Sequence, residues 1–301
     1  MSNFDCVVIG SGPSGMTAAI YLRRANLNVA IIEKSAPGGL MNNIINIENY
    51  PGFTRVEGPT LSMKMNKQVT DLNVTYKYGN VVSVENYGDY KIVKTETEEI
   101  KCKSVIVASG RVPRKLGLEN EDKLIGRGIG FCALCDGFFF KDKPVAIVGG
   151  GNGAVEAAMY LSTICSEVFL IHRRNELTAD KATIDKLKSR ENIKIKYNSV
   201  VNTIIPENNK LKAINISTNN QISKLEIEGM FIYIGQIPDT NYLVKSGVKL
   251  EKQYVLVDPT MRTNIKNIYA CGDVIKKEIY QITTAIGEGT IAATSATKDI
   301  N

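Results

Sequence analysis

The segment DCVVIGSGPSGMTAAIYLRRANLNVAIIEK, residues 5–34, decides the fold of this chain. It begins with a short apolar run, passes through a glycine turn into a helical pattern, and ends with a second apolar run. This order predicts a strand, a helix and a second strand parallel to the first. The segment KPVAIVGGGNGAVEAAMYLSTICSEVFLIHRR, residues 143–174, repeats the same order. One constant offset superposes Gly10 on Gly149, Gly12 on Gly151, and Gly15 on Ala154.

The glycines of the repeat have a physical task. The first permits a tight turn, the second lets the backbone approach a pyrophosphate, and the third position, Gly or Ala, lets the helix pack on the strand. The beginning of the helix then offers free N–H groups to the phosphates. The fold class is therefore predicted as α/β, with two Rossmann-like, three-layer nucleotide-binding domains.

The residues that end the second strands distinguish the two sites. Glu33 ends the first copy, where a carboxylate accepts hydrogen bonds from ribose hydroxyls. The same offset brings His172 to this position in the second copy, followed by Arg173 and Arg174. A carboxylate repels a 2′-phosphate, whereas guanidinium groups bind it. The second site is predicted to bind NADP(H), and the first is predicted to bind FAD or NAD.

A later segment favours FAD in the first site. IYACGDV, residues 268–274, reads as a strand that ends in Gly272 and Asp273, and a helix rich in small residues starts near Gln281. An aspartate at a strand end beside the beginning of a helix suits the ribityl and pyrophosphate part of a flavin. The chain thus runs from one nucleotide fold through another and back to the first, which predicts an inserted second domain.

A CxxC pair, Cys132 and Cys135, lies in GIGFCALCDG, residues 128–137. Such a pair is typical of a zinc half-site, a structural disulfide or a redox couple. Zinc needs four ligands, but the single histidine, His172, is assigned to the nucleotide site and the other four cysteines are scattered. No metal is therefore expected. Beside FAD and NADPH, the pair is interpreted as a redox couple that receives electrons from the flavin.

Composition excludes several other classes. The net charge of +6 comes from lysines spread along the chain, without a dense basic block, so nucleic-acid binding is not expected. No apolar run approaches 18 residues and the start lacks a signal-peptide pattern, so no membrane association is expected. The sparse cysteines fit a reducing compartment, which predicts a cytoplasmic location.

The motifs FCALCDGFFF, IVGGGNGAVEAAMYLS, IHRR, IENYPGF, GMFIYIGQIPDT and YACGDV occur here in one order. Together they resemble the bacterial low-molecular-weight thioredoxin reductases, over essentially the whole chain. The resemblance implies a homodimer with one FAD per subunit. It also implies an FAD-binding domain of residues 1–114 and 241–301, an NADPH-binding domain of residues 115–240, and electron transfer from NADPH to oxidised thioredoxin.

The resemblance also implies site residues. Cys132 would attack the thioredoxin disulfide, Cys135 would face the flavin, and Asp136 would exchange protons. The expected FAD contacts are Gly10, Gly12, Pro13, Ser14, Gly15, Glu33, Lys34, Gly39, Leu40, Asn49, Gly110, Gly272, Asp273, Gln281 and Ile282. The expected NADPH contacts are Gly149, Gly151, Asn152, Gly153, Ala154, His172, Arg173 and Arg174.

Two alternatives stay open from the sequence. The first is the same fold with ferredoxin or NADH as the electron donor, or with another thioredoxin-like acceptor. The second is a non-catalytic flavoprotein that only binds a partner. The resemblance also implies that the domain carrying both the cysteine pair and the NADPH motif rotates between two orientations, one for each electron transfer.

Three residues depart from the family pattern. Thr178 and Tyr280 each stand where the family has an arginine, and Leu40 replaces a glutamine. We expect a weaker but retained preference for NADPH over NADH, and fewer polar contacts to FAD. The run Phe138–Phe140 is expected to pack below the redox loop, where an exposed phenylalanine would help to dock a protein.

Overall fold

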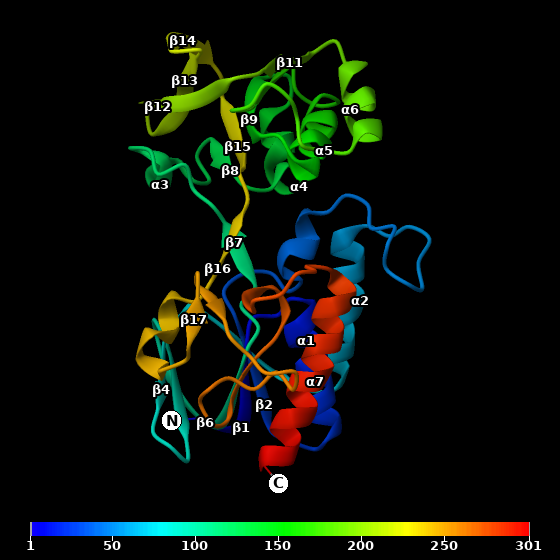
Figure 1. Cartoon of the computed structure of the whole chain (residues 1–301), viewed down its shortest axis with the longest axis vertical. Coiled ribbons are helices and arrows are strands. Elements are labelled where there is room, and N and C mark those ends of the chain that lie inside the picture. Colours follow the sequence, from blue (N-terminus) through cyan, green and yellow to red (C-terminus); the bar gives the residue numbers. More distant parts are fainter. Residues whose placement is uncertain (1, 301) are drawn as a thin grey trace. The chain divides into compact units, whose positions relative to one another are not determined.

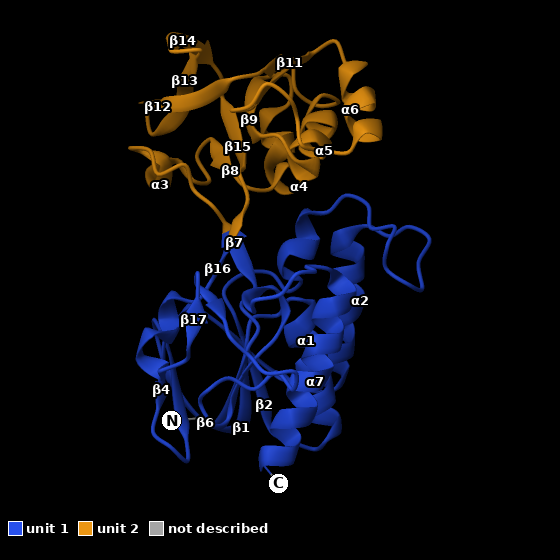
Figure 2. Cartoon of the chain, viewed as in Figure 1, with its two compact units in different colours: residues 1–112, 237–301 blue, residues 113–236 orange. Residues whose placement is uncertain are grey.

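The structure, a computed structural model, describes residues 2–300. The chain forms two compact units, which Figure 2 shows in different colours. Unit 1 contains the chain up to Val112 and again from Ile237, and unit 2 contains Pro113–Gln236. The changes of unit therefore follow residues 112 and 236, against expected changes after residues 114 and 240. Unit 2 is inserted into unit 1.

Unit 1 is built on a seven-stranded sheet (Figure 1). Its order is β3 (Thr75–Tyr78), β2 (Val29–Glu33), β1 (Ser2–Ile9), β6 (Glu99–Val107), β5 (Lys91–Thr95) and β4 (Val81–Asn86), and β19 (Ile268–Ala270) also pairs with β6. Strands β3, β2, β1, β6 and β19 run parallel to one another. Strand β5 pairs antiparallel with β6, and β4 pairs antiparallel with β5. Helices α1 (Pro13–Arg24), α2 (Gly58–Asp71) and α7 (Ile282–Ile300) lie together on one side of the sheet.

Alternation along the central strand explains why both faces of this sheet are covered. Cys6 and Val8 belong to the apolar core that includes the helices, whereas Val7 and Ile9 belong to the core on the other face. A strand that is buried on both faces needs apolar residues at every position. Helices α1 and α7 pack together through small residues, which permit close approach; these are Ala18, Ala19, Ala292, Ala293 and Ala296.

Unit 2 has a parallel sheet and a separate antiparallel sheet. The parallel order is β11 (Ile193–Lys196), β10 (Glu167–Ile171), β9 (Pro144–Gly149), β15 (Gly229–Tyr233) and β8 (Ile129–Gly130). The antiparallel sheet contains β12 (Ser199–Glu207), β13 (Lys210–Thr218) and β14 (Gln221–Glu226). Its helices are α3 (Glu121–Leu124), α4 (Ala133–Asp136), the 3-10 helix η2 (Gly137–Phe140), α5 (Asn152–Leu161) and α6 (Lys181–Lys188).

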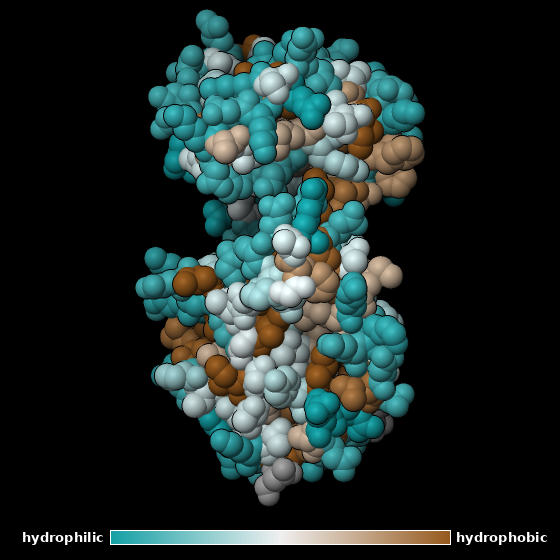
Figure 3. Space-filling model, turned by 90° about the vertical axis from the view of Figure 1, so that its right-hand side faces the viewer, coloured by the Kyte–Doolittle hydropathy of each residue, from teal (hydrophilic) through white to brown (hydrophobic). Residues whose placement is uncertain are grey.

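The chain crosses between the units twice. The crossings are β7 (Arg111–Pro113) and β16 (Gln236–Pro238), which pair with each other. The remaining short elements of unit 1 are η1 (Gly39–Asn43), η3 (Asn241–Ser246), β17 (Leu250–Glu251), β18 (Tyr254–Val255) and η4 (Gly272–Val274). Polar side chains cover much of the face seen in Figure 3. Within residues 2–300, no helix has the length and apolar character that a membrane crossing requires.

Candidate active site

The first glycine turn links β1 to α1 and leaves space in front of the helix. Gly10 has φ +99°, and a Cβ there would lie 2.5 Å from the carbonyl oxygen of Ala108. A Cβ on Gly15 would lie 2.0 Å from the carbonyl oxygen of Gly10. Gly12, by contrast, would place a Cβ where no atom lies within 4 Å, and no side chain caps the helix there. The turn is thus a cradle open at Gly12, which fits a pyrophosphate.

Glu33 is fixed beside this turn. Its carboxylate accepts hydrogen bonds from the backbone N–H of Ser11 at 2.7 Å and from the Ser11 hydroxyl at 2.8 Å. The N–H of Ser35 donates to its other oxygen at 2.9 Å. Lys34 instead forms an exposed ion pair of 2.5 Å with Asp239. The carboxylate is therefore held at the end of β2 beside the glycine turn, and Lys34 is directed toward a different partner.

Residues from distant parts of unit 1 surround the beginning of α1. A Cβ on Gly39, in η1, would lie 3.4 Å from the Cα of Gly12. A Cβ on Gly272, in η4, would lie 2.3 Å from the hydroxyl oxygen of Ser14, the second residue of α1. These approaches assemble the N-terminal motif, the η1 segment and the C-terminal motif into one cradle.

The other expected flavin residues occupy the ends of elements in unit 1. Asn49 donates from Nδ2 to Oε1 of Gln281 at 3.2 Å, and Ile282 begins α7. Gly110 has φ +65° with open space beside it, and Leu40 is half-buried in η1. Pro13 is the first residue of α1. Asp273 forms an ion pair with Arg111.

The second glycine turn links β9 to α5. A Cβ on Gly149 would lie 2.5 Å from the carbonyl oxygen of Tyr233, so this glycine is required for packing. Gly151 directly precedes α5 as its N-cap without a side-chain cap, and a Cβ there would meet nothing closer than the Thr178 hydroxyl at 3.9 Å. Ala154 is buried where the helix meets the sheet. This cradle is also open at its second glycine.

Two side chains near this turn are held by protein partners. Asn152 donates from Nδ2 to Oδ2 of Asp180 at 2.8 Å, and its Oδ1 accepts from the Asp180 N–H at 2.8 Å. The Thr178 hydroxyl donates to the carbonyl of Gly150 at 3.2 Å. Thr178, which stands where the family has an arginine, therefore braces the glycine turn instead of extending a cation toward a phosphate. Gly153 lies beside the ring of Tyr233, against which its Cβ would approach to 3.5 Å.

The end of β10 combines a buried imidazole with two exposed cations. His172 fills the space over Gly150, whose Cβ would lie 2.2 Å from Nδ1. Its buried Nε2 has no hydrogen-bond partner in residues 2–300, and burial lowers the pKa of the imidazole below its usual range. Arg173 and Arg174 are exposed and form no ion pair with any described carboxylate. Unpaired guanidinium groups beside an open glycine turn fit a 2′-phosphate.

The cysteine pair forms a disulfide between Cys132 and Cys135. Cys132 caps α4, and its Sγ accepts the N–H of Cys135 at 3.1 Å. Its side chain is 9% exposed, whereas Cys135 is exposed. The hydroxyl oxygen of Tyr233 accepts the N–H of Ala133 at 3.0 Å, which holds the loop against β15. The other four cysteines are buried and form no disulfide.

Asp136 directly follows the pair in a half-buried position. Burial raises the pKa of its carboxyl above the usual range. Its Oδ2 lies near Gly130, whose Cβ would approach it to 3.1 Å. Burial likewise raises the pKa of Tyr233, and the charge of Asp136 adds to this rise. A carboxyl that keeps its proton beyond its usual range, next to a disulfide, is suited to proton exchange with thiols.

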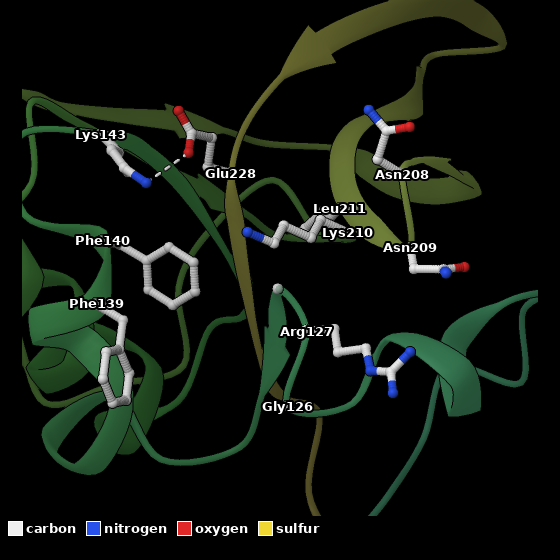
Figure 4. A pocket seen from close by; sticks show the side chains of 11 residues that line it. Gly126, Arg127, Phe139, Phe140, Lys143, Asn208, Asn209, Lys210, Leu211 and Glu228 are labelled. Atoms are coloured by element: carbon white, nitrogen blue, oxygen red, sulfur yellow. Dashed lines mark ion pairs between the residues drawn. The ribbon is translucent and has the colours of Figure 1, made fainter.

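A cavity of about 440 Å³ is lined by residues on both sides of the cysteine pair in the sequence, among them Gly128 and Phe139 (Figure 4). Phe139, 75% exposed, lies at its edge, while Phe140 packs edge-on against Phe231 at 5.6 Å between ring centres. Lys143 is paired with Glu228 at 2.8 Å, the dashed line in Figure 4. The remaining cations lining the cavity are Arg127 and Lys210, which form no ion pair with a carboxylate among residues 2–300.

Sequence reasoning missed several residues at these sites. Arg111 and Lys277 contact Asp273, and the Glu288 carboxylate accepts the Gly272 N–H at 2.9 Å. Tyr233 lies between the second glycine turn and the redox loop. Lys277 lies four positions after Asp273, so this contact had a local signal, whereas Arg111 and Asp273 are 162 positions apart and Tyr233 and Ala133 are 100 positions apart.

Comparison with known proteins identifies the class. Residues 4–289 match the family described as pyridine nucleotide-disulphide oxidoreductase. The thioredoxin reductase of Bacillus subtilis (strain 168) is 39% identical over 294 residues, which are 97% of this chain and 93% of that protein. The crystal structure of Lactococcus lactis thioredoxin reductase has a TM-score of 0.89 at 39% identity, covering 99% of each chain.

One further solved structure has an electron donor, ferredoxin, in its name. The ferredoxin-flavin thioredoxin reductase from Clostridium acetobutylicum is 28% identical, with a TM-score of 0.56, over 99% of this chain and 98% of that one. The chain belongs to the pyridine nucleotide-disulphide oxidoreductase family. Membership implies a flavin and a pyridine nucleotide as cofactors. No group of three or more His, Cys, Asp or Glu side chains within residues 2–300 is arranged to hold a metal ion.

Proposed function

We propose that this chain is a thioredoxin reductase that transfers electrons from NADPH, through FAD, to the disulfide of oxidised thioredoxin. One observation carries the proposal: the Cys132–Cys135 disulfide occurs in a chain with two glycine turns, each open in front of a helix. The reaction balances as NADPH, one proton and a disulfide giving NADP⁺ and a dithiol. Two electrons pass in each turnover.

The two cradles are assigned to different nucleotides. Unit 1 would hold FAD through the open turn at Gly12, the carboxylate of Glu33 and the η4 segment around Asp273. Unit 2 would hold NADPH through the open turn at Gly151 and the unpaired guanidinium groups of Arg173 and Arg174. The carboxylate of Glu33 would repel a 2′-phosphate, which is why NADPH is assigned to unit 2.

The bound flavin would accept a hydride and pass two electrons to a disulfide. The chain's own residues would then carry out the disulfide exchange and the proton transfers. In the roles that the resemblance implies, Cys135 meets the flavin and Cys132 attacks the acceptor, after the bond between them has opened. The N–H of Cys135, 3.1 Å from Sγ of Cys132, stabilises negative charge on that sulfur. Asp136, whose pKa is raised by burial, supplies and recovers the proton.

The cavity lined by Gly128 and Phe139 is the proposed docking site for thioredoxin. Phe139 offers an exposed apolar contact. It lies in η2, which directly follows α4 and the cysteine pair in the sequence. Arg127 and Lys210 add unpaired positive charge, which favours an acidic partner surface. Phe139→Ser should raise KM for thioredoxin about tenfold and leave flavin reduction by NADPH unchanged. Ile222→Ser, which changes an exposed apolar residue of β14, is the matched control.

In the proposed reaction, two different parts of unit 2 must reach the same flavin: the bound NADPH in one step and the cysteine pair in the next. The cysteine pair and the proposed NADPH residues belong to unit 2, whereas the proposed flavin residues belong to unit 1. We propose that unit 2 changes its orientation about the crossings β7 and β16 between the two transfers. A covalent crosslink between the units should stop turnover; full turnover by the crosslinked enzyme would refute the motion. The active form is proposed to be a homodimer, which sedimentation measurements test.

One anaerobic titration tests the main proposal. NADPH should bleach the flavin absorbance of the purified protein, and added oxidised thioredoxin should restore it. Cys132→Ser and Cys135→Ser should still be bleached by NADPH but should reduce thioredoxin at least about a thousandfold more slowly. A purified chain that cannot be loaded with flavin, or full reductase activity in either serine variant, would overturn the proposal.

The main alternative is the same reaction with a ferredoxin as donor, as the name of the Clostridium acetobutylicum protein states for that enzyme. The open turn at Gly151 and the unpaired arginines favour a nucleotide over a protein donor. Bleaching by a reduced ferredoxin, with no bleaching by NADPH or NADH, would establish the alternative.

A further inference from the structure

Arg111 lies among the expected flavin residues without having been counted as one of them. Its Nη2 lies 2.7 Å and its Nε 3.2 Å from Oδ2 of Asp273. Its guanidinium carbon lies 4.2 Å from the centre of the Tyr280 ring. Gly110 precedes it and Gln281 follows Tyr280, and both are expected flavin residues. A single side chain thus joins β7 to the segment that leads into α7.

The charges around Arg111 are balanced within unit 1. Asp273 also lies 3.7 Å from Nζ of Lys277, which in turn pairs with Glu288 at 2.8 Å. Arg111 and Asp273 are 20% and 21% exposed, so water screens their attraction less than that of a surface pair. Burial raises the pKa of Glu288, whose carboxylate accepts the Gly272 N–H. The segment of residues 272–281 is therefore held by alternating charges, and Arg111 is their link to β7.

The sequence explains why this arginine is needed. Position 280 is a tyrosine in this chain, where the family pattern has an arginine. The structure places a guanidinium directly over that tyrosine, but it comes from residue 111, on a different strand. A planar cation over an aromatic face is an attractive contact, and the bonds to Asp273 fix its position.

We propose that Arg111 is a positioning residue of the flavin site, which supplies from β7 the guanidinium that position 280 lacks. This inference rests on the assignment of FAD to unit 1. Arg111 holds Asp273 by charge-assisted hydrogen bonds and holds Tyr280 by stacking, and it thereby orders the segment that carries Asp273 and Gln281. The partly buried side chain of Arg111 makes these contacts with Asp273 and Tyr280 within unit 1.

Reciprocal substitutions test the exchange of positions. FAD is removed from the purified protein, and its dissociation constant is measured by titration with FAD, followed by flavin fluorescence. Arg111→Ala should weaken FAD binding about 10- to 100-fold, because Asp273 loses the charge-assisted hydrogen bonds that hold it in the site. Tyr280→Arg alone should also weaken binding, because it brings two cations together. The double variant Arg111→Ala/Tyr280→Arg should bind FAD more tightly than either single variant.

A second arginine provides a matched control. Arg262 forms two hydrogen bonds of 2.9 Å with Asp299, and it lies 6.0 Å from the ring centre of Tyr269. Arg262→Ala therefore removes a similar Arg–Asp–Tyr contact from unit 1, away from the expected flavin residues. This variant should lower the melting temperature of the apoprotein and leave FAD affinity within about twofold of wild type. Arg111→Ala should also lower the melting temperature of the apoprotein, but it alone should weaken FAD binding.

The outcomes separate this inference from the proposed function. If wild type binds FAD and Arg111→Ala binds it equally well, the role of Arg111 is overturned while the flavin assignment stands. A double variant that binds no better than both single variants would also overturn it. A wild-type apoprotein that takes up no FAD would contradict the proposed function itself, and this inference with it.

Discussion

Asp136 is expected to lower the stability of the fold when it is ionised and to take part in proton transfer beside the disulfide. Its carboxyl is half-buried next to the disulfide, and burial raises its pKa. A carboxyl whose pKa is higher in the folded than in the unfolded state favours folding only while it is protonated. Its contribution is fully present below the unfolded pKa and is lost as the pH rises through the folded pKa. Above its folded pKa, the ionised side chain therefore destabilises the fold.

We predict that Asp136→Asn stabilises the protein and slows the reaction. The neutral amide avoids the cost of burying a charge, so the melting temperature at pH 8 should rise by about one to three degrees. This gain should vanish in acid, where Asp136 itself is protonated. Thioredoxin reduction should fall about 100-fold, because the proton donor is lost. Thermal unfolding at several pH values and steady-state kinetics measure the two effects.

The exposed Asp185, in α6, is the control for this prediction. Asp185→Asn should change neither the melting temperature nor the rate. A destabilised Asp136→Asn at pH 8 would contradict the electrostatic account of this residue.

At the scale of elements, the two glycine turns separate packing from ligand binding. The first and third glycines of the N-terminal turn are in contact with backbone, whereas the second faces open space. Residues within one motif therefore have different physical reasons to be small.

Two alanine variants of α1 and its turn should fail in different ways. Gly12→Ala adds a methyl group to open space at ordinary backbone angles of −71° and −178°, so apoprotein stability should be unchanged. FAD binding should weaken at least about tenfold, because the methyl group occupies the phosphate cradle. Gly15→Ala should destabilise the apoprotein by about 1–3 kcal/mol, because its Cβ would lie 2.0 Å from the Gly10 carbonyl oxygen. Chemical unfolding and flavin titration distinguish them; equal losses of stability would contradict this division.

The end of β10 should set the choice between the two pyridine nucleotides. Replacing both Arg173 and Arg174 by alanine should raise KM for NADPH about 10- to 100-fold and leave KM for NADH nearly unchanged, because only NADPH carries the 2′-phosphate. Wild type should still prefer NADPH, although Thr178 supplies no cation. Steady-state kinetics with both nucleotides tests this, and an equal loss for both would show that these arginines do not contact that phosphate.

At the scale of the whole molecule, the chain divides into two units with separate cores. The cores of unit 1 are built around β1 and β6, and those of unit 2 around β9 and β15. If FAD and NADPH bind different units, each ligand should stabilise its own unit by mass action.

Hydrogen exchange should resolve this division along the chain. FAD should slow exchange in residues 10–15 and 272–282, whereas NADP⁺ added to the holoenzyme should slow it in residues 149–154 and 172–174. Binding protects amides that lie at the ligand or in segments that the ligand orders. Protection of residues 149–154 by FAD alone would contradict the assignment of nucleotides to units.

Local patterns predicted much of this structure. Gly10, Gly12 and Gly15 indicated a strand, a turn and a helix because each element there is formed from neighbours in the sequence. The repeat at Gly149 indicated a second nucleotide fold for the same reason. The CxxC spacing brings two sulfurs together where the chain turns into a helix, as it does at α4, and the structure shows that they are bonded.

The tertiary structure alone showed how distant groups combine. Arg111 and Asp273 form an ion pair although they are 162 positions apart in the sequence, and no local sequence pattern predicts that pairing. The same holds for Tyr233 beside the redox loop and for His172 over Gly150. The sequence by itself determined which elements form and which chemistry they carry, because periodicity and turn residues act over a few positions. Only the folded chain decided which charges neutralise one another and which side chains are buried, because these depend on contacts between segments that the sheets bring together.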